Sequence, residues 1–197
     1  MLRIWTYKQV VGDMKLVKLS VFAAIFFAFT SAALGQKVPA FSQYKAAVEK
    51  KRVITVDLKS HKDARMFRTN LRNAAKGGVN FAGHYVLTGW GCGTNCSQWA
   101  IIDARNGRVY FPKQFAGVGF GFCELPENAM PKDAPKEDDD SAGPIYFKKN
   151  SRLVVLTGYP GGGLDDDKVK CGNYFYEWNG TSLKQIKLIP GKRGDTP

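Results

Sequence analysis

Four cysteines constrain the fold of this chain more than any other feature of its sequence. They are Cys92, Cys96, Cys123 and Cys171. An even number of cysteines in an exported chain is typical of a disulfide framework, and four cysteines allow three pairings. We favour Cys92–Cys96, which spans a tight glycine-containing loop. The second pair, Cys123–Cys171, would close a loop of about 49 residues, worth about 4 kcal/mol in the chain-entropy account of disulfides.

Zinc binding is the alternative interpretation of these cysteines, because His84 lies close to them in the sequence. Cys92 and Cys96 have the spacing Cys-x3-Cys, whereas structural zinc sites often use Cys-x2-Cys, and no second histidine lies nearby. The sequence therefore favours disulfides, and we expect no metal site and no cofactor.

The N-terminal segment gives the reason to expect export. Residues 14–18 are short and basic, residues 19–29 are apolar apart from Ser20, and residues 30–35 are rich in small side chains. Ala33 and Gly35 would place signal cleavage before Gln36. The apolar run is shorter than the about 20 residues of a membrane span, which leaves an uncleaved anchor as the alternative.

This segment sets the expected domain organisation. Residues 1–35 are predicted to be a signal peptide, and translation starts at either Met1 or Met14, in which second case residues 1–13 are a mis-assigned extension. Residues 36–190 would form a single globular domain, and residues 191–197 a disordered tail. The mature protein would work in the periplasm or be secreted, and only an uncleaved signal would hold it at the membrane.

The charge of the mature chain suggests anionic partners. Removing residues 1–35 leaves 25 basic and 16 acidic residues, a net charge of +9. Such a charge favours an anionic envelope polymer or an acidic protein. The longest basic run is only residues 50–52, so a generally basic soluble surface is the alternative. We do not expect nucleic acid as a partner.

Hydrophobic periodicity predicts helices before residue 80 and strands after it. Residues 42–50 and 60–76 are expected to be helices, separated by a half-buried strand at 53–58. The second helix would be capped by Ser60, with Asp63 three residues on, and would end at the glycines 77–78. Its apolar stripe comprises Phe67, Leu71 and Ala74, with Met66 beside it.

The remainder of the chain alternates as strands joined by turn residues. Three hairpins are expected, across Asn106-Gly107, Asn150-Ser151 and Asn179-Gly180, because Asn-Gly favours type I′ turns. The fold class is therefore α+β, with short N-terminal helices packed on a mostly antiparallel sheet. Residues 86–90 and 155–159 resemble each other, which predicts two similar β-units, with chance resemblance as the alternative.

One segment carries a resemblance to known proteins. Residues 80–85 include Gly-His-Tyr, and residues 89–96 read Gly-Trp-Gly-Cys-Gly-x-x-Cys. The combination resembles an uncharacterised family of small exported bacterial proteins, over roughly residues 80–112. The resemblance implies a periplasmic or secreted protein and carries no residue role.

Two candidate chemistries follow from the polar residues. His84 could act in acid–base catalysis with an aspartate of residues 165–167, as in an envelope hydrolase, or it could be a structural histidine. Asp165 and Asp166, on a glycine-rich loop, could also hold Ca²⁺ or be simply solvated. No residue is assigned a catalytic role, and the hypothesis that the protein is an enzyme is the less favoured one.

The favoured hypothesis is a non-enzymatic binding module, such as an inhibitor or immunity-type protein. Trp90 and Tyr159 stand at equivalent ends of the two similar segments, beside glycines that expose the backbone. Exposed aromatic side chains there could stack on a protein or sugar partner. The alternative is that both residues close the core.

Overall fold

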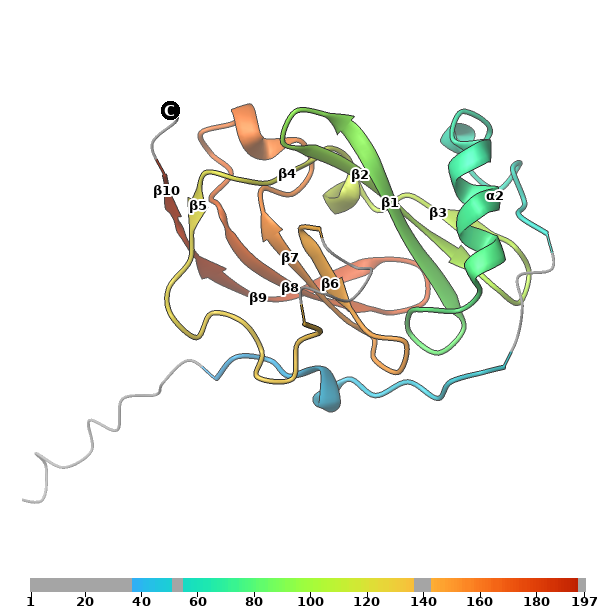
Figure 1. Cartoon of the computed structure of the whole chain (residues 1–197), viewed down its shortest axis with the longest axis horizontal. Helices are drawn as coiled ribbons and strands as arrows, with labels where there is room; N and C mark the ends of the chain where they lie inside the picture. Colours follow the sequence, from blue (N-terminus) through green and yellow to red (C-terminus); the bar gives the residue numbers. More distant parts are fainter. Residues whose placement is uncertain (1–36, 51–54, 137–142, 195–197) are drawn as a thin grey trace, which may run out of the picture. The chain divides into compact units, whose positions relative to one another are not determined.

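Two antiparallel sheets packed face to face form the centre of the protein (Figure 1). The computed structural model describes residues 37–50, 55–136 and 143–194, with the side chain of Asp165 excepted. The expected signal peptide, the acidic run at 137–140 and the start of the expected strand at 53–58 lie outside these residues. The described residues from Val38 onward belong to one compact unit.

Each of the two main sheets has four strands, and every strand pair is antiparallel. The first sheet has the order β1 (Tyr85–Gly93), β2 (Cys96–Asp103) and β3 (Val109–Tyr110), with β4 (Val118–Gly119) also paired to β2. The second has the order β6 (Ile145–Phe147), β7 (Leu153–Gly158), β8 (Gly172–Trp178) and β9 (Leu183–Pro190). A separate pair joins β5 (Cys123–Glu124) to β10 (Lys192–Arg193).

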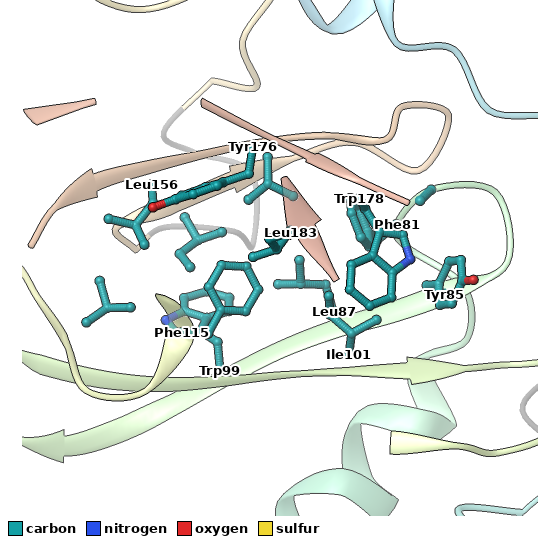
Figure 2. Close-up of a cluster of buried hydrophobic side chains, with 14 of the residues drawn as sticks. Phe81, Tyr85, Leu87, Trp99, Ile101, Phe115, Leu156, Tyr176, Trp178 and Leu183 are labelled. Atoms are coloured by element: carbon teal, nitrogen blue, oxygen red, sulfur yellow. The ribbon is translucent and has the colours of Figure 1, made fainter. Parts of the chain in front are cut away.

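Alternating side chains explain why both faces of each sheet are covered. Leu87 and Ile101 of the first sheet meet Leu156 and Tyr176 of the second in the main core, as Figure 2 shows. Their sequence neighbours point the other way. On the outer face of the first sheet lie Val86 and Ile102, and on the outer face of the second lie Val155 and Phe175.

Helix α2 (Arg68–Gly77) covers the outer face of the first sheet. Leu71 is fully buried there, and Phe67 and Ala74 pack beside it, so the predicted apolar stripe is confirmed. The helix ends at Gly77, followed by Gly78 with φ of 77°, as expected for a glycine that stops a helix. Met66 is 73% exposed and does not belong to the stripe.

The predicted start of this helix is wrong. A 3₁₀ turn, η2 (Lys62–Arg65), precedes α2, and His61 caps it by accepting a hydrogen bond from the Asp63 N–H. The Ser60 hydroxyl instead accepts a hydrogen bond from the Val109 N–H and donates one to the Asp57 carbonyl. Ser60 therefore ties the chain to β3 and is not free to cap a helix.

The predicted helix over residues 42–50 is also wrong. Only a 3₁₀ turn, η1 (Phe41–Gln43), forms there, and the chain then runs extended beside Asn150 and Arg152. Buried Phe41 packs on the outer face of the second sheet. The described residues thus contain one α-helix, and the coarse α+β class with two disulfides is confirmed.

The three hairpins form, but with longer connections than a two-residue type I′ turn. Asp103 donates its N–H to the Arg108 carbonyl across four intervening residues, and Trp178 pairs with Leu183 across another four. Gly107 and Gly180 have positive φ values, whereas Asn106 and Asn179 do not. In the second case the Asn179 side chain accepts hydrogen bonds from two backbone N–H groups and so stabilises the turn itself.

Both favoured disulfides are present. Cys92–Cys96 joins the end of β1 to the start of β2, with Cα atoms 5.2 Å apart. Cys123–Cys171 joins β5 to the residue before β8, with Cα atoms 5.7 Å apart. β10 lies in the segment expected to be a disordered tail, so this part of the tail is ordered. Within the described ranges, no helix has the length and apolar character needed to cross a membrane.

Candidate functional site

Strand β1 forms an edge of the first sheet, since β2 is its sheet neighbour on one side only. The Asp103 N–H bonds toward β3, so Ile102, Ala100 and Gln98 direct their backbone groups toward β1. Their partners Val86, Thr88 and Trp90 are therefore the hydrogen-bonded positions of β1. The positions between them direct their N–H and C=O groups away from the sheet.

The first half of this edge is already satisfied by the chain itself. Tyr85 bonds to the backbone of residues 80 and 81. At Leu87, the Asn80 side chain forms the hydrogen bonds that a neighbouring strand would otherwise form. Its Nδ2 donates to the Leu87 carbonyl at 2.9 Å, and its Oδ1 accepts from the Leu87 N–H at 2.8 Å. The edge groups of Tyr85 and Leu87 are thereby unavailable to a partner.

Among the described residues, no strand pairs with the second half of the edge. Gly89 and Gly91 continue the alternation, and both are exposed. None of the hydrogen bonds found in the described part of the chain uses their outward N–H and C=O groups. Such groups are the template on which an extended chain adds to a sheet. The molecule therefore presents four backbone groups in register for a short added strand.

A groove runs along this open edge, with a volume of 1040 Å³. One wall comes from the end of α2 and from Trp90, and the other from Pro144 and Phe147 near β6. Trp99 and Phe120 also contribute to its lining. This volume is slightly above the range of ordinary ligand sites, and the apolar lining beside exposed backbone groups suits a peptide.

Packing explains one of the two glycines but not the other. The Trp99 indole lies flat against Gly89, so a Cβ there would come within 2.5 Å of the ring. The Trp99 Nε1 donates to the Ser97 hydroxyl at 2.8 Å, which fixes the ring in this position. A Cβ at Gly91, in contrast, would meet nothing within 4 Å. The open space at Gly91 gives a place to alter the edge without disturbing the core.

The two aromatic residues expected at a shared binding surface have different environments. Trp90 lies in the groove wall, half-buried, with its ring 4.7 Å from that of Phe67. Its indole nitrogen is buried and has no hydrogen-bond partner in the structure as described. Tyr159 is 1% exposed, and its hydroxyl donates to the Phe122 carbonyl at 3.2 Å. Tyr159 is thus a core residue and does not line the groove.

His84 lies just before β1, at the end opposite the open edge. Its Nε2 is 4.0 Å from Asp103 Oδ1, at the far end of β2. That carboxylate also accepts hydrogen bonds from the Arg105 N–H at 2.8 Å and from the Asn106 side chain at 3.2 Å. Asp103 therefore organises the β2–β3 turn, and the His84 ring lies beside its carboxylate.

The structure does not bring His84 to residues 165–167. Leu164, in the turn η4 (Gly163–Asp165), packs against Gly119, which pairs with Cys96 at the start of β2. His84 lies at the other end of β2, and seven residue steps at about 3.3 Å separate the two ends by about 23 Å. The supposed catalytic pair is therefore not formed.

The acidic loop is held by other groups. The Asp166 carboxylate accepts from the Lys168 N–H at 2.9 Å, and Asp167 pairs with Arg193 at 3.0 Å. Arg193 also donates to the Leu164 carbonyl at 2.7 Å. Within the ranges that the structure describes, no group of three or more His, Cys, Asp or Glu side chains could hold a metal ion.

Comparisons with known proteins add no assignment to this geometry. No protein-family model, curated protein or solved structure matches the chain. The resemblance to small exported bacterial proteins therefore stays a prediction. The candidate site depends on its own geometry alone.

The residues that define the groove were only partly visible in the sequence. Trp90 was expected near a binding surface, and it does line the groove. Asn80, Gly89 and Gly91 lie within the segments that carry the family resemblance. Their importance depends on which side of β1 is unpaired, and no local pattern reveals that.

Proposed function

We propose that this protein is an exported binding module that adds an extended segment of a partner polypeptide to the edge of β1. The observation that carries the proposal is the pair of exposed glycines, Gly89 and Gly91, whose outward backbone groups face an apolar groove. Main-chain hydrogen bonds would supply affinity, and Trp90 and Phe147 would contact alternate side chains of the segment. An inhibitor or immunity-type role fits this mode of binding.

Export remains part of this proposal. Two disulfides favour an oxidising compartment, such as the periplasm or the exterior of the cell. The predicted signal segment favours the same location. The hydrolase hypothesis has less support, because it requires His84 and an aspartate of residues 165–167 to share one site.

We also propose that the two sheets contain copies of one β-unit. In support, Leu87 and Leu156 occupy equivalent places in the similar segments, and both face the main core. Val86 and Val155, one residue earlier, both face outward. Each copy continues into a hairpin whose turn contains an Asn-Gly pair.

The test uses peptides selected from a displayed random library on the immobilised protein. A proline at position 91 removes the outward N–H and places a ring on the edge, while the bonds from Trp90 to β2 remain. Binding of selected peptides to Gly91→Pro should weaken by roughly 10-fold or more, since hydrogen bonds and a complementary fit are lost. Fluorescence anisotropy of labelled peptide measures the change.

Gly91→Ala is the matched control, because a Cβ at this position meets open space. It should bind the peptides as the unmodified protein does, and both variants should keep their thermal stability. Amide exchange at Gly89 and Gly91 should slow when peptide is bound. Equal binding by the proline variant, or a selection that yields no peptide, would contradict the proposal.

A further inference from the structure

A second hollow lies away from the β1 groove, between β3, the start of η2 and the β8–β9 connection. Its volume is 440 Å³, and its lining includes Arg108, Lys113, His61, Tyr110, Phe111 and Ser182. None of its lining residues in the described part of the chain is acidic. A hollow with basic side chains and no carboxylate has a positive potential that attracts anions.

The two basic side chains are available to a ligand. Neither Arg108 nor Lys113 forms an ion pair with a carboxylate in the parts of the chain that the structure describes. The Arg108 guanidinium lies 5.7 Å from the centre of the Tyr110 ring, which limits its motion. A guanidinium held in this way can bind a carboxylate or phosphate through two parallel hydrogen bonds.

His61 adds a third donor. Its Nδ1 accepts a hydrogen bond from the Asp63 N–H at 3.2 Å, which leaves Nε2 as the nitrogen that can donate to a ligand. The Asp63 carboxylate is 3.6 Å from Nδ1 and does not line the hollow. The ring itself packs 4.7 Å from Phe111.

The remaining wall suits a polar ring more than a bare inorganic ion. Ser182 accepts a hydrogen bond from the Asn179 side chain at 2.9 Å, which leaves its own proton for a ligand. Tyr110 and Phe111 offer aromatic surface beside it. The hollow is also larger than a single phosphate needs, since its volume lies within the range of sites for organic ligands.

We propose that this hollow binds a sugar that carries an oxyanion, either a phosphate ester or a carboxylate. Arg108 and Lys113 would hold the anionic group, while Tyr110 or Phe111 would pack on the sugar ring. The site is independent of the β1 groove. It would let the protein hold an anionic envelope polymer at one place and a polypeptide at another.

Titration calorimetry with four probes tests this proposal. The protein is purified in the processed form that its own cells produce. The probes are glucose 6-phosphate, glucuronate, glucose and inorganic phosphate. At least one anionic sugar should bind roughly 10-fold more tightly than both glucose and inorganic phosphate, because only it engages the basic and the aromatic residues together. The better of the two anionic sugars identifies the source of the oxyanion.

The double variant Arg108→Gln/Lys113→Gln should lose at least roughly 10-fold in affinity for that sugar. Arg72→Gln/Lys168→Gln is the matched control, because it removes the same charge from exposed residues outside the hollow. Equal losses in both variants would mean attraction by net charge alone and would overturn the proposal. So would a failure of all four probes to bind, or binding of phosphate as tight as that of the sugars.

Discussion

Burial decides what an aromatic side chain next to glycines can do, and Tyr159 illustrates this at the level of one residue. Its neighbour Gly158 has φ of 117°, and a Cβ there would lie 2.2 Å from the Gly119 carbonyl oxygen. The glycine therefore permits the close approach of β4, whose Gly119 pairs with the backbone of Tyr159. In the sequence, the same glycines suggested exposed backbone beside an exposed ring.

Substitution of Tyr159 should consequently affect stability more than binding. Tyr159→Ala should lower the free energy of unfolding by about 3–5 kcal/mol, because it leaves a large cavity. Tyr159→Phe should cost only about 1 kcal/mol, since it removes the hydrogen bond to Phe122 and keeps the ring. Urea unfolding followed by far-UV circular dichroism measures both values. An alanine variant as stable as the unmodified protein would show that the ring is not a core residue.

At the level of elements, the carboxylate of Asp133, in the loop before β6, is one of the groups that hold the segment around η1. Asp133 accepts hydrogen bonds from the N–H groups of Phe41 at 3.0 Å and Ser42 at 2.9 Å. Burial by itself raises the pKa of Asp133, but these hydrogen bonds and nearby Lys148 lower the pKa below its usual value of 3.8. The folded state therefore favours the ionised form of Asp133.

This attachment should depend on pH. A carboxyl group whose folded pKa is depressed stabilises the protein above its unfolded pKa of 3.8, and the effect is lost as pH falls through the folded pKa. Asp133→Asn should lower the free energy of unfolding by about 1 kcal/mol near neutral pH. The expected loss is small because the carboxylate is partly exposed to solvent. Urea unfolding at a series of pH values checks this. A constant difference at every pH would indicate a steric cause.

The elements that could be predicted are those whose partners lie nearby in the sequence. The stripe of Phe67, Leu71 and Ala74 predicted α2 because helical spacing alone places these residues on one face. The hydrophobic periodicity around residues 42–50 predicted a second helix and was misleading. The backbone there bonds to Asn150 and Arg152 instead, a pairing that no local pattern contains.

In the whole molecule too, features set by nearby residues could be predicted, and features set by distant residues could not. Alternation predicted strands and hairpins, and cysteine spacing predicted both disulfides. Two features depend on how distant strands are ordered: the packing of two sheets on each other and the free edge of β1. The candidate groove lies at that edge, so the sequence indicated one of its residues, Trp90, and placed the other aromatic, Tyr159, wrongly.

The two disulfides should contribute unequally to the stability of the whole molecule. Cys123 and Cys171 are 48 residues apart, whereas Cys92 and Cys96 are 4 apart. In the chain-entropy account, loss of the longer link should cost about 4 kcal/mol and loss of the shorter about 2 kcal/mol. Paired Cys→Ser variants, compared by urea unfolding, test this ranking. The reverse order would indicate that native contacts, and not loop length, set the contributions.

The Asn80 side chain has a consequence for how copies of this protein behave at high concentration. A long exposed strand edge invites copy after copy to stack into fibres, a hazard that folded proteins must limit. Asn80 occupies the outward N–H and C=O groups of Leu87. The free edge of β1 is therefore only a few residues long, between Asn80 and the end of β1 that the disulfide closes. A free edge of this length can bind one flexible peptide, but it is too short for the rigid strands of another copy to begin a fibre.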